Sequence, residues 1–463
     1  MNFLRKAALA AIASCGLLLF GCGSTFRPVA NVIPQAAGNP TLLDLVAVLN
    51  QNPLTTSPLS GGIQPASGSF TLVDVDGDSN VGNFPVGVNT TIPVPPATPS
   101  LLPRVTFAAA NSLIATADPD AGTVTLSSTS LPSSAVTLPA TPNAIAATAG
   151  SGLVLVSLSN DTADCAPVPH GAVRIIQAST ASLTSQAICL SFNPGFILVL
   201  PGDQRALVLE NNNPTGTNAA LINIPSATLL ATLTVGSNPV WAASSQDGNA
   251  AYVLNKAGAT ITVVDVVHQA TVGAAVSTGG SSPSMIVADH VLNRLYVSNT
   301  GTNSVAVFSA LANTVLSLGS PVSLNSVSPG TSPIALAVTP DGSELYVANT
   351  GAASATVINT STFAATLIPV PSQPAGTTAT WLTVSKDGTR AYLTLVDQPA
   401  DVGSGTAIVL TASNSLLIDS TNGKPAIIKP PPQDPASPCA LNPADSSCAT
   451  VTRQRPVQLA PHL

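Results

Sequence analysis

The sequence predicts an all-β protein: a β-propeller of four-stranded blades, with seven or eight blades. Two observations predict this class. A unit made of short apolar segments recurs every 44 to 50 residues in the middle of the chain, and Val and Thr are frequent beside 33 Gly and 41 Pro. β-branched residues suit a pleated sheet, whereas Gly and Pro interrupt helices. Repeated units of this length that hold several short strands are typical of propellers.

The repeat is clearest over residues 244–395. Tyrosines mark equivalent positions in four successive units: Tyr252, Tyr296, Tyr346 and Tyr392. A strand led by Pro or Thr precedes each tyrosine, in the strings NPVWAASS, SPSMIVAD, SPIALAVT and TATWLTVS, and a Val-rich strand follows each one. Asp-Gly pairs that begin at Asp247, Asp341 and Asp387 predict tight turns between the first and second strands.

Each unit is therefore expected to contribute four short strands. Its first strand alternates large and small apolar residues, and we expect the small ones near the crowded axis of the ring. Weaker copies begin near residues 105, 144 and 197, and residues 41–90 hold a unit without its first strand. Residues 424–431 (KPAIIKPP) are predicted to supply that strand and close a ring of eight blades. Seven blades follow if residues 41–90 only cover an end.

Two strings of the repeat point to a known family. LYVSNTGTNSVAVF and LYVANTGAASATVIN resemble the repeat of YVTN-family β-propellers, which is also seen in lactonase-like seven-bladed propellers. The resemblance covers residues 237–395. It implies the fold and leaves the function open, because propellers carry many activities on one scaffold. We expect the Tyr to pack between blades and the Asn to close a turn with its side chain.

The N-terminus has the pattern of a bacterial lipoprotein signal peptide. Arg5 and Lys6 precede an apolar stretch, residues 7–20, that is too short to span a bilayer comfortably. The string LFGC resembles a lipobox, which implies acylation of Cys22 and firm attachment to a membrane. Ordinary secretion, with a cysteine there by chance, is the alternative. Gly23 is not the acidic residue that resembles an inner-membrane retention signal, so we expect the outer membrane.

The chain is thereby divided into four parts. They are a lipoprotein signal peptide at 1–21, a lipidated tether at 22–40, a β-propeller at 41–428, and a Pro-rich, disulfide-stapled tail at 429–463. In the mature chain we expect Cys439 to pair with Cys448 and Cys165 to pair with Cys189, as suits an oxidising compartment. A zinc site is the alternative, but no CxxC spacing or neighbouring group of histidines supports it.

One acidic string is a candidate calcium site. Asp74, Asp76 and Asp78 alternate along a short loop, and Ca²⁺ prefers carboxylate oxygens. The string resembles EF-hand-like and integrin-type calcium loops, but Ser79 stands where Gly is usual and no acidic residue closes the loop. A solvated turn between the last two strands of a blade explains the same residues without a metal. No other cofactor is expected.

The remaining motifs exclude several classes of function. The net charge is −7 and no run of Lys and Arg could neutralise phosphates, so nucleic-acid binding is not expected. The four histidines are scattered, and no GxSxG, GxGxxG or Walker motif lies in its required context, so no catalytic residue is predicted. Arg205, Lys386 and Arg390 lie beside first-to-second-strand turns, towards one rim rather than in one pocket.

The expected function is therefore a lipid-anchored, extracytoplasmic binding or scaffold module in the bacterial cell envelope, with the outer membrane favoured and either leaflet open. Its expected partner is an envelope protein or a glycan. A lactonase-like hydrolase or isomerase that uses the central cleft is the alternative, and a purely structural envelope protein is a third hypothesis. An Arg, a His and a carboxylate gathered in the central cleft would favour the enzyme.

Overall fold

The structure is a computed structural model in which β-strands form a closed ring. It describes residues 45–51, 68–85, 102–108, 113–119, 121–127, 133–165, 171–184, 186–211, 213–311, 313–327, 332–397, 404–420, 422–430 and 455–461. The predicted signal peptide and the tether with Cys22 lie outside these residues, as do Cys439 and Cys448.

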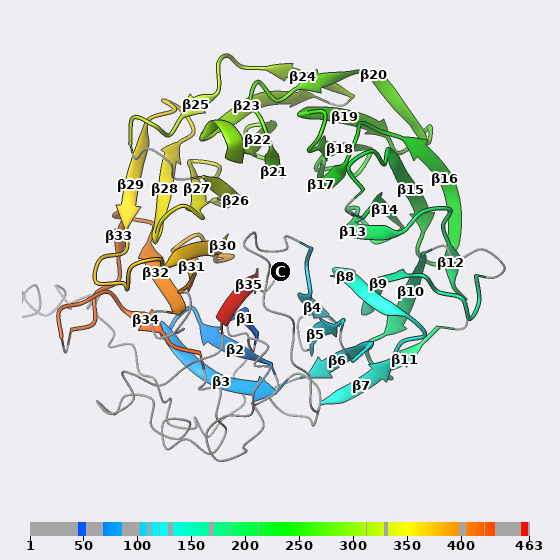
Figure 1. The fold of residues 1–463 in the computed structure, drawn as a ribbon, viewed down its shortest axis with the longest axis horizontal. Helices are drawn as coiled ribbons and strands as arrows, with labels where there is room; N and C mark the ends of the chain where they lie inside the picture. The colour runs from blue at the N-terminus through cyan, green and yellow to red at the C-terminus, as the bar shows by residue number, and fades with distance from the viewer. Residues whose placement is uncertain are drawn as a thin grey trace, which may run out of the picture.

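Eight sheets surround a central hub, so the chain is an eight-bladed β-propeller (Figure 1). The predicted all-β class is confirmed, and eight blades rather than seven are formed. In the described residues the single helical element is a short 3₁₀ turn, η1 (Thr300–Thr302). No described helix has the length and hydropathy needed to cross a bilayer.

The blades are numbered along the chain, with strands given from the hub outward. Blade 1 holds β35 (Arg455–Pro461), β1 (Leu45–Gln51), β2 (Ser69–Asp74) and β3 (Ser79–Pro85); blade 2 holds β4 (Val105–Ala108), β5 (Leu113–Asp118), β6 (Thr123–Ser127) and β7 (Ser134–Thr137); blade 3 holds β8 (Thr141–Ala147), β9 (Leu153–Ser159), β10 (Ala172–Gln177), and β11 (Ser182–Leu183) with β12 (Ile188–Cys189); blade 4 holds β13 (Pro194–Val199), β14 (Arg205–Glu210), β15 (Asn218–Asn223) and β16 (Thr228–Thr234).

The second half of the ring repeats this order. Blade 5 holds β17 (Pro239–Ser244), β18 (Ala250–Asn255), β19 (Thr260–Asp265) and β20 (Ala270–Ser277); blade 6 holds β21 (Pro283–Asp289), β22 (Arg294–Asn299), β23 (Ser304–Leu311), and β24 (Thr314–Ser317) with β25 (Val322–Ser323); blade 7 holds β26 (Pro333–Val338), β27 (Glu344–Asn349), β28 (Ser354–Asn359) and β29 (Ala365–Pro369); blade 8 holds β30 (Thr378–Val384), β31 (Arg390–Val396), β32 (Gly405–Leu410), and β33 (Ser415–Leu416) with β34 (Ile427–Ile428).

The ring is closed by the C-terminal strand and not by residues 424–431, so that prediction was wrong. β35 pairs antiparallel with β1 and becomes the innermost strand of blade 1 (Figure 1), which also places residues of the predicted irregular tail inside the propeller. Residues 424–431 instead contain β34, which pairs with β32 at the outer edge of blade 8. The physical reason is proximity, because β34 follows its own blade along the chain and can pair there without crossing the ring.

The core lies between neighbouring blades. The four repeated tyrosines are at most 1% exposed and pack among aliphatic side chains, which confirms their predicted role. Burial raises the pKa of Tyr252 and of Tyr296 to about 12. The three Asp-Gly turns join first and second strands as predicted, with Gly248, Gly342 and Gly388 at φ of 70°, 72° and 72°. Glycine adopts this left-handed conformation without strain.

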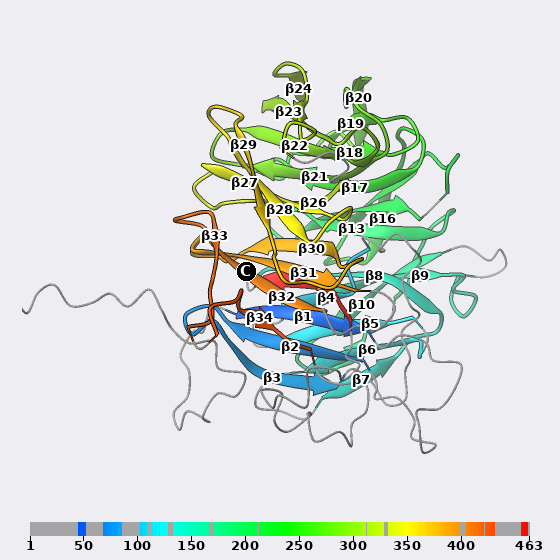
Figure 2. The ribbon, with the colours of Figure 1, turned by 60° about the vertical axis from the view of Figure 1, so that its left-hand side comes forward.

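The connections divide between two faces of the ring, because successive strands of a blade run antiparallel. Turns from first to second strand and from third to fourth strand lie on one face, called here the short-turn face, where the longest is 128–133. Connections from second to third strand and from one blade to the next lie on the opposite, long-connection face. The longest in sequence span 52–68, 86–104, 160–171 and 429–454, and the described strand ends that they join lie on this face. Figure 2 shows β1, β2 and β3 running between these faces.

Candidate functional site

The hub contains aromatic side chains. Trp241 of blade 5 and Trp381 of blade 8 have ring centroids 5.9 Å apart, although two blades lie between them along the ring. The ring centroid of Phe196 lies 4.2 Å from that of Trp241. Large side chains therefore meet at the axis, where we expected small ones. Eight inner strands enclose a wide hub, and protein interiors fill such space with side chains.

The described hub holds no histidine, which the central-cleft hypothesis requires. His268 and His290 lie in turns of the short-turn face, and the side chain of His268 is 79% exposed. Within the described residues no three His, Cys, Asp or Glu side chains gather as they would around a metal ion. His170 and His462 lie outside those residues. The described hub thus gives no support to lactonase-like chemistry.

Arginines on the short-turn face bind neighbouring blades. Arg205 and Arg294 each begin the second strand of a blade, and each donates a hydrogen bond of 2.6 Å to a backbone carbonyl in the next blade, at Val266 and Thr360 respectively. Arg294 also lies over the ring of Phe363. These contacts hold both guanidinium groups between blades, and Arg294 also lines a cavity between blades 5 and 6. The signal in the sequence was an arginine at the first position of a second strand.

The acidic string at residues 74–78 also takes part in contacts between neighbouring blades. Asp78 accepts two hydrogen bonds from Arg390, while Asp74 accepts a hydrogen bond from the backbone N–H of Asp76. The three carboxylates do not form a described metal site. The alternative interpretation, a turn between the last two strands of the blade, fits this geometry better, because Asp78 is directed at a neighbouring blade.

Asn349 of one YVTN-like string closes a turn on the long-connection face, as predicted, whereas Asn299 of the other string donates to the backbone carbonyl of Thr278 and does not close its own turn. Asn349 donates from Nδ2 to the hydroxyl oxygens of Ser354 and Thr356 across the turn that follows β27. Asn255 bonds Thr260 and Thr262 in the same way. Because these amides are fully buried, they serve the turn and are not available to a ligand.

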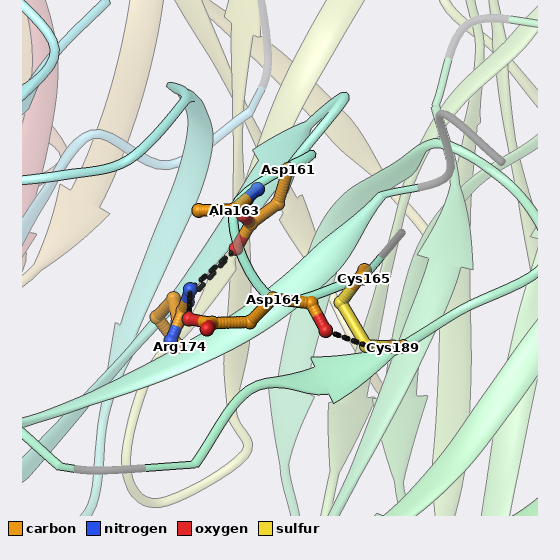
Figure 3. The surroundings of a disulfide bond; sticks show 6 residues. All are labelled: Asp161, Ala163, Asp164, Cys165, Arg174 and Cys189. Atoms are coloured by element: carbon orange, nitrogen blue, oxygen red, sulfur yellow. Dashed lines mark hydrogen bonds and ion pairs between the residues drawn. A yellow bond between two sulfur atoms is a disulfide. The ribbon is translucent and has the colours of Figure 1, made fainter. Parts of the chain in front are cut away.

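The long connection of blade 3 is held by a disulfide and by buried charges (Figure 3). Cys165 is bonded to Cys189, which confirms that predicted pair, and the Cα atoms lie 5.5 Å apart. Arg174 is bound by Asp161 and Asp164, and Asp161 is fully buried. Burial alone lowers the pKa of Arg174, but hydrogen bonds to both carboxylates outweigh it and raise the pKa. The described part of this connection, through Cys165, is therefore tied to β10 and β12 of its own blade.

Two cavities open between blades on the short-turn face. A cavity of about 360 Å³ lies between blades 5 and 6, where its lining includes Asp247, His290 and Leu311. A cavity of about 750 Å³ lies between blades 7 and 8 and is lined by Asp341, Asp387 and several hydroxyl groups. Hydrogen bonds from neighbouring groups engage each of these three aspartates.

Aliphatic side chains project from turns beside the smaller cavity. Val267, Val291, Leu292 and Leu311 are 53%, 56%, 39% and 61% exposed, and all lie at turns of the short-turn face in blades 5 and 6. We call these four residues the aliphatic patch. Sequence reasoning missed it, although the string HVLN where other blades have Asp-Gly was a visible signal.

Comparison with known proteins places the chain among β-propeller proteins and shows the fold alone. No protein-family model matches it, and no curated protein matches it. Dihydro-heme d1 dehydrogenase NirN in complex with DHE is similar with a TM-score of 0.58 and 15% identity, over 84% of this chain and 76% of that one. Apo AztD from Citrobacter koseri is similar with a TM-score of 0.54 and 10% identity, over 91% of this chain and 98% of that one.

Proposed function

We propose that the chain is a lipid-anchored propeller of the bacterial cell envelope that binds or scaffolds an envelope protein or a glycan through its long-connection face. The anchor is the acylated Cys22, and the location is the outer membrane. The YVTN-like strings and the lipobox-like string support this assignment. Membership of the YVTN family belongs to the proposal as well.

The observation that carries the proposal is the segregation of long connections. The strand ends that the longest connections join all lie on one face, whereas the strand ends of the other face are joined by short turns. Binding residues are disproportionately found on loops that a rigid scaffold positions. The ring of eight blades is such a scaffold, and the disulfide at Cys165 and Cys189 fixes one of the long connections to it.

Two further observations support the proposal. Disulfides persist in oxidising compartments, so the Cys165–Cys189 bond suits an exported protein. The described arginines and carboxylates are engaged in contacts between and within blades, which suits a scaffold better than a catalyst.

The anchor is tested by expressing the full chain in a bacterial host and measuring the mass of its N-terminal peptide. A cleaved chain with acyl groups on Cys22 is expected, and the Cys22→Ser variant should remain unacylated. A cleaved chain whose Cys22 carries no acyl group would contradict the anchor.

The binding face is tested with a photo-crosslinking amino acid placed at one exposed residue on each face. Thr162 lies in the long connection of blade 3, and Gln246 lies in a turn of the short-turn face. We expect a specific cross-linked product, protein or polysaccharide, from envelope extracts only with the label at Thr162. Equal products from both positions, or a product from Gln246 alone, would contradict the assignment of the face.

A further inference from the structure

The aliphatic patch is a local departure from the repeat. In blades 5, 7 and 8 the turn between first and second strands carries an Asp-Gly pair whose aspartate is exposed, whereas blade 6 has Asp289 followed by His290, Val291 and Leu292. Asp289 is 2% exposed and accepts hydrogen bonds from the backbone N–H groups of Val291 and Leu292. The carboxylate thus turns inward, and the two aliphatic side chains point to solvent.

The neighbouring turns extend the patch. Leu311 ends β23 on the same face, and Val267 lies in the adjacent turn of blade 5. Asn313 joins these two turns with a hydrogen bond of 2.7 Å to Asp265. Of the eight large hydrophobic side chains that are exposed among the described residues, five lie in blade 6. Such clustering marks an interaction surface, whereas single exposed hydrophobic residues do not.

The position at which the chain enters the ring indicates what this patch contacts. Leu45, the first residue of β1, lies opposite Asp74 beside the turn at 75–78, so the chain enters the ring on the short-turn face. The segment from Cys22 to Leu45 can extend over roughly 75 Å. An anchor at Cys22 therefore holds the short-turn face within reach of the bilayer, and the long-connection face can point away from it.

We propose that the aliphatic patch docks on the phospholipid bilayer that holds the acyl anchor, with Val267, Val291, Leu292 and Leu311 entering the boundary between head groups and acyl chains. Aliphatic side chains gain free energy when they leave water for this boundary. The proposal rests on the proposed anchor, and it orients the ring so that its partner-binding face is presented to the periplasm.

Charges around the patch define the lipid surface that it fits. Asp247 lies exposed in the adjacent turn of blade 5, and Arg294 is held by Thr360 and Phe363 of blade 7. His268 and His290 are exposed beside the patch. No free Lys or Arg is described in these turns, so the attraction is apolar, and a zwitterionic bilayer is expected to serve at least as well as an anionic one.

The test measures the depth of a tryptophan introduced into the patch. The lipid-anchored full chain with Leu292→Trp is reconstituted in vesicles of phosphatidylcholine whose acyl chains carry bromine. We expect bromine to lower the added emission relative to vesicles without bromine if the side chain enters the boundary region. Ala257→Trp, exposed on the long-connection face, is the matched control and should not be quenched. Trp241 and Trp381 lie in the hub and contribute the same background to both variants.

The outcomes separate the patch from the anchor. Vesicles that float with the protein while Leu292→Trp and Leu311→Trp both remain unquenched would overturn docking and leave the anchor in place. Protein that does not float, with no acyl group on Cys22, would overturn the proposed anchor. If unquenched variants accompany a dimer that Leu292→Ser disrupts in sedimentation, the patch contacts a second copy of the chain and the proposal is wrong. Leu311→Trp keeps the test valid if Leu292→Trp fails to fold.

Discussion

Arg390 of blade 8 forms a two-point ion pair with Asp78 of blade 1, across the seam where the last and first blades meet. Nε donates to Oδ1 at 2.7 Å and Nη2 donates to Oδ2 at 3.0 Å. The side chain of Asp78 is 2% exposed, and that of Arg390 is 22% exposed. The hydrogen bonds to Asp78 raise the pKa of Arg390, so this guanidinium stays charged over the whole physiological range.

The Arg390→Ala variant should lower the free energy of unfolding by ~3 kcal/mol, because it leaves the carboxylate of Asp78 buried without its partner. Urea denaturation of the variant and the wild type measures the difference. Arg205→Ala is the control, since it removes a bond to a neutral carbonyl and should cost about 1 kcal/mol. An equal decrease in the free energy of unfolding for the two variants would show that the Arg390–Asp78 pair stabilises the protein no more than the Arg205 hydrogen bond does.

Deletion of residues 455–463 should prevent formation of a soluble monomer. The deletion removes β35 and exposes the inner edge of β1, and unpaired edges promote aggregation. Soluble yield and size-exclusion chromatography measure the effect. A chain that lacks only residues 462–463 should behave as the wild type. A monomeric, folded product of the longer deletion would mean that the ring does not need β35.

Removal of the Cys165–Cys189 bond should destabilise the protein by about 3 kcal/mol, because the unfolded chain gains the freedom of the loop that the bond closes. Cys165→Ala/Cys189→Ala is compared with the wild type by urea denaturation. Cys439→Ser/Cys448→Ser provides the background in which a reductant acts on the first bond alone. A stability that reductant does not change in that background would contradict the prediction.

The Asp341→Asn variant should lose stability at neutral pH but not at acidic pH. The hydrogen bond from Thr339 and those from Ser343 lower the pKa of Asp341 below 3.8 in the folded state. A depressed pKa stabilises the fold above the unfolded-state pKa, and this contribution disappears as the pH falls through the folded-state pKa. The difference between wild type and variant, measured by denaturation from pH 7 to pH 2.5, should therefore shrink below pH 3.8. A constant difference would exclude this explanation.

The repetitive part of the fold could be predicted from the sequence because the strands and turns of each unit follow from local sequence patterns. The tyrosines at 252, 296, 346 and 392, the Asp-Gly turns and the turn-closing Asn349 all act within or between adjacent units, so local patterns were sufficient. Ring closure by β35 could not be predicted in this way. RPVQLAP carries little of the repeat pattern, and its pairing with β1 joins the two ends of the chain.

The candidate site was less accessible to sequence reasoning. Arg390 and Asp78 are 312 positions apart, and only the closed ring brings them together. The sequence by itself therefore offers Asp78 only as a possible calcium ligand. The Cys165–Cys189 pair was predictable, because both cysteines belong to one blade. The aliphatic patch depends on the inward orientation of the Asp289 carboxylate, and side-chain orientation in a turn could not be predicted from the sequence.

The position of β1 between β2 and β35 has a consequence for biogenesis. Synthesis from the N-terminus delivers β1 first and its inner partner last, after more than four hundred residues have been made. Throughout that interval the first blade has an open edge, and non-local pairing of this kind is slow. Chaperones that shield strand edges should therefore matter more to this propeller than to one whose closing strand is made early.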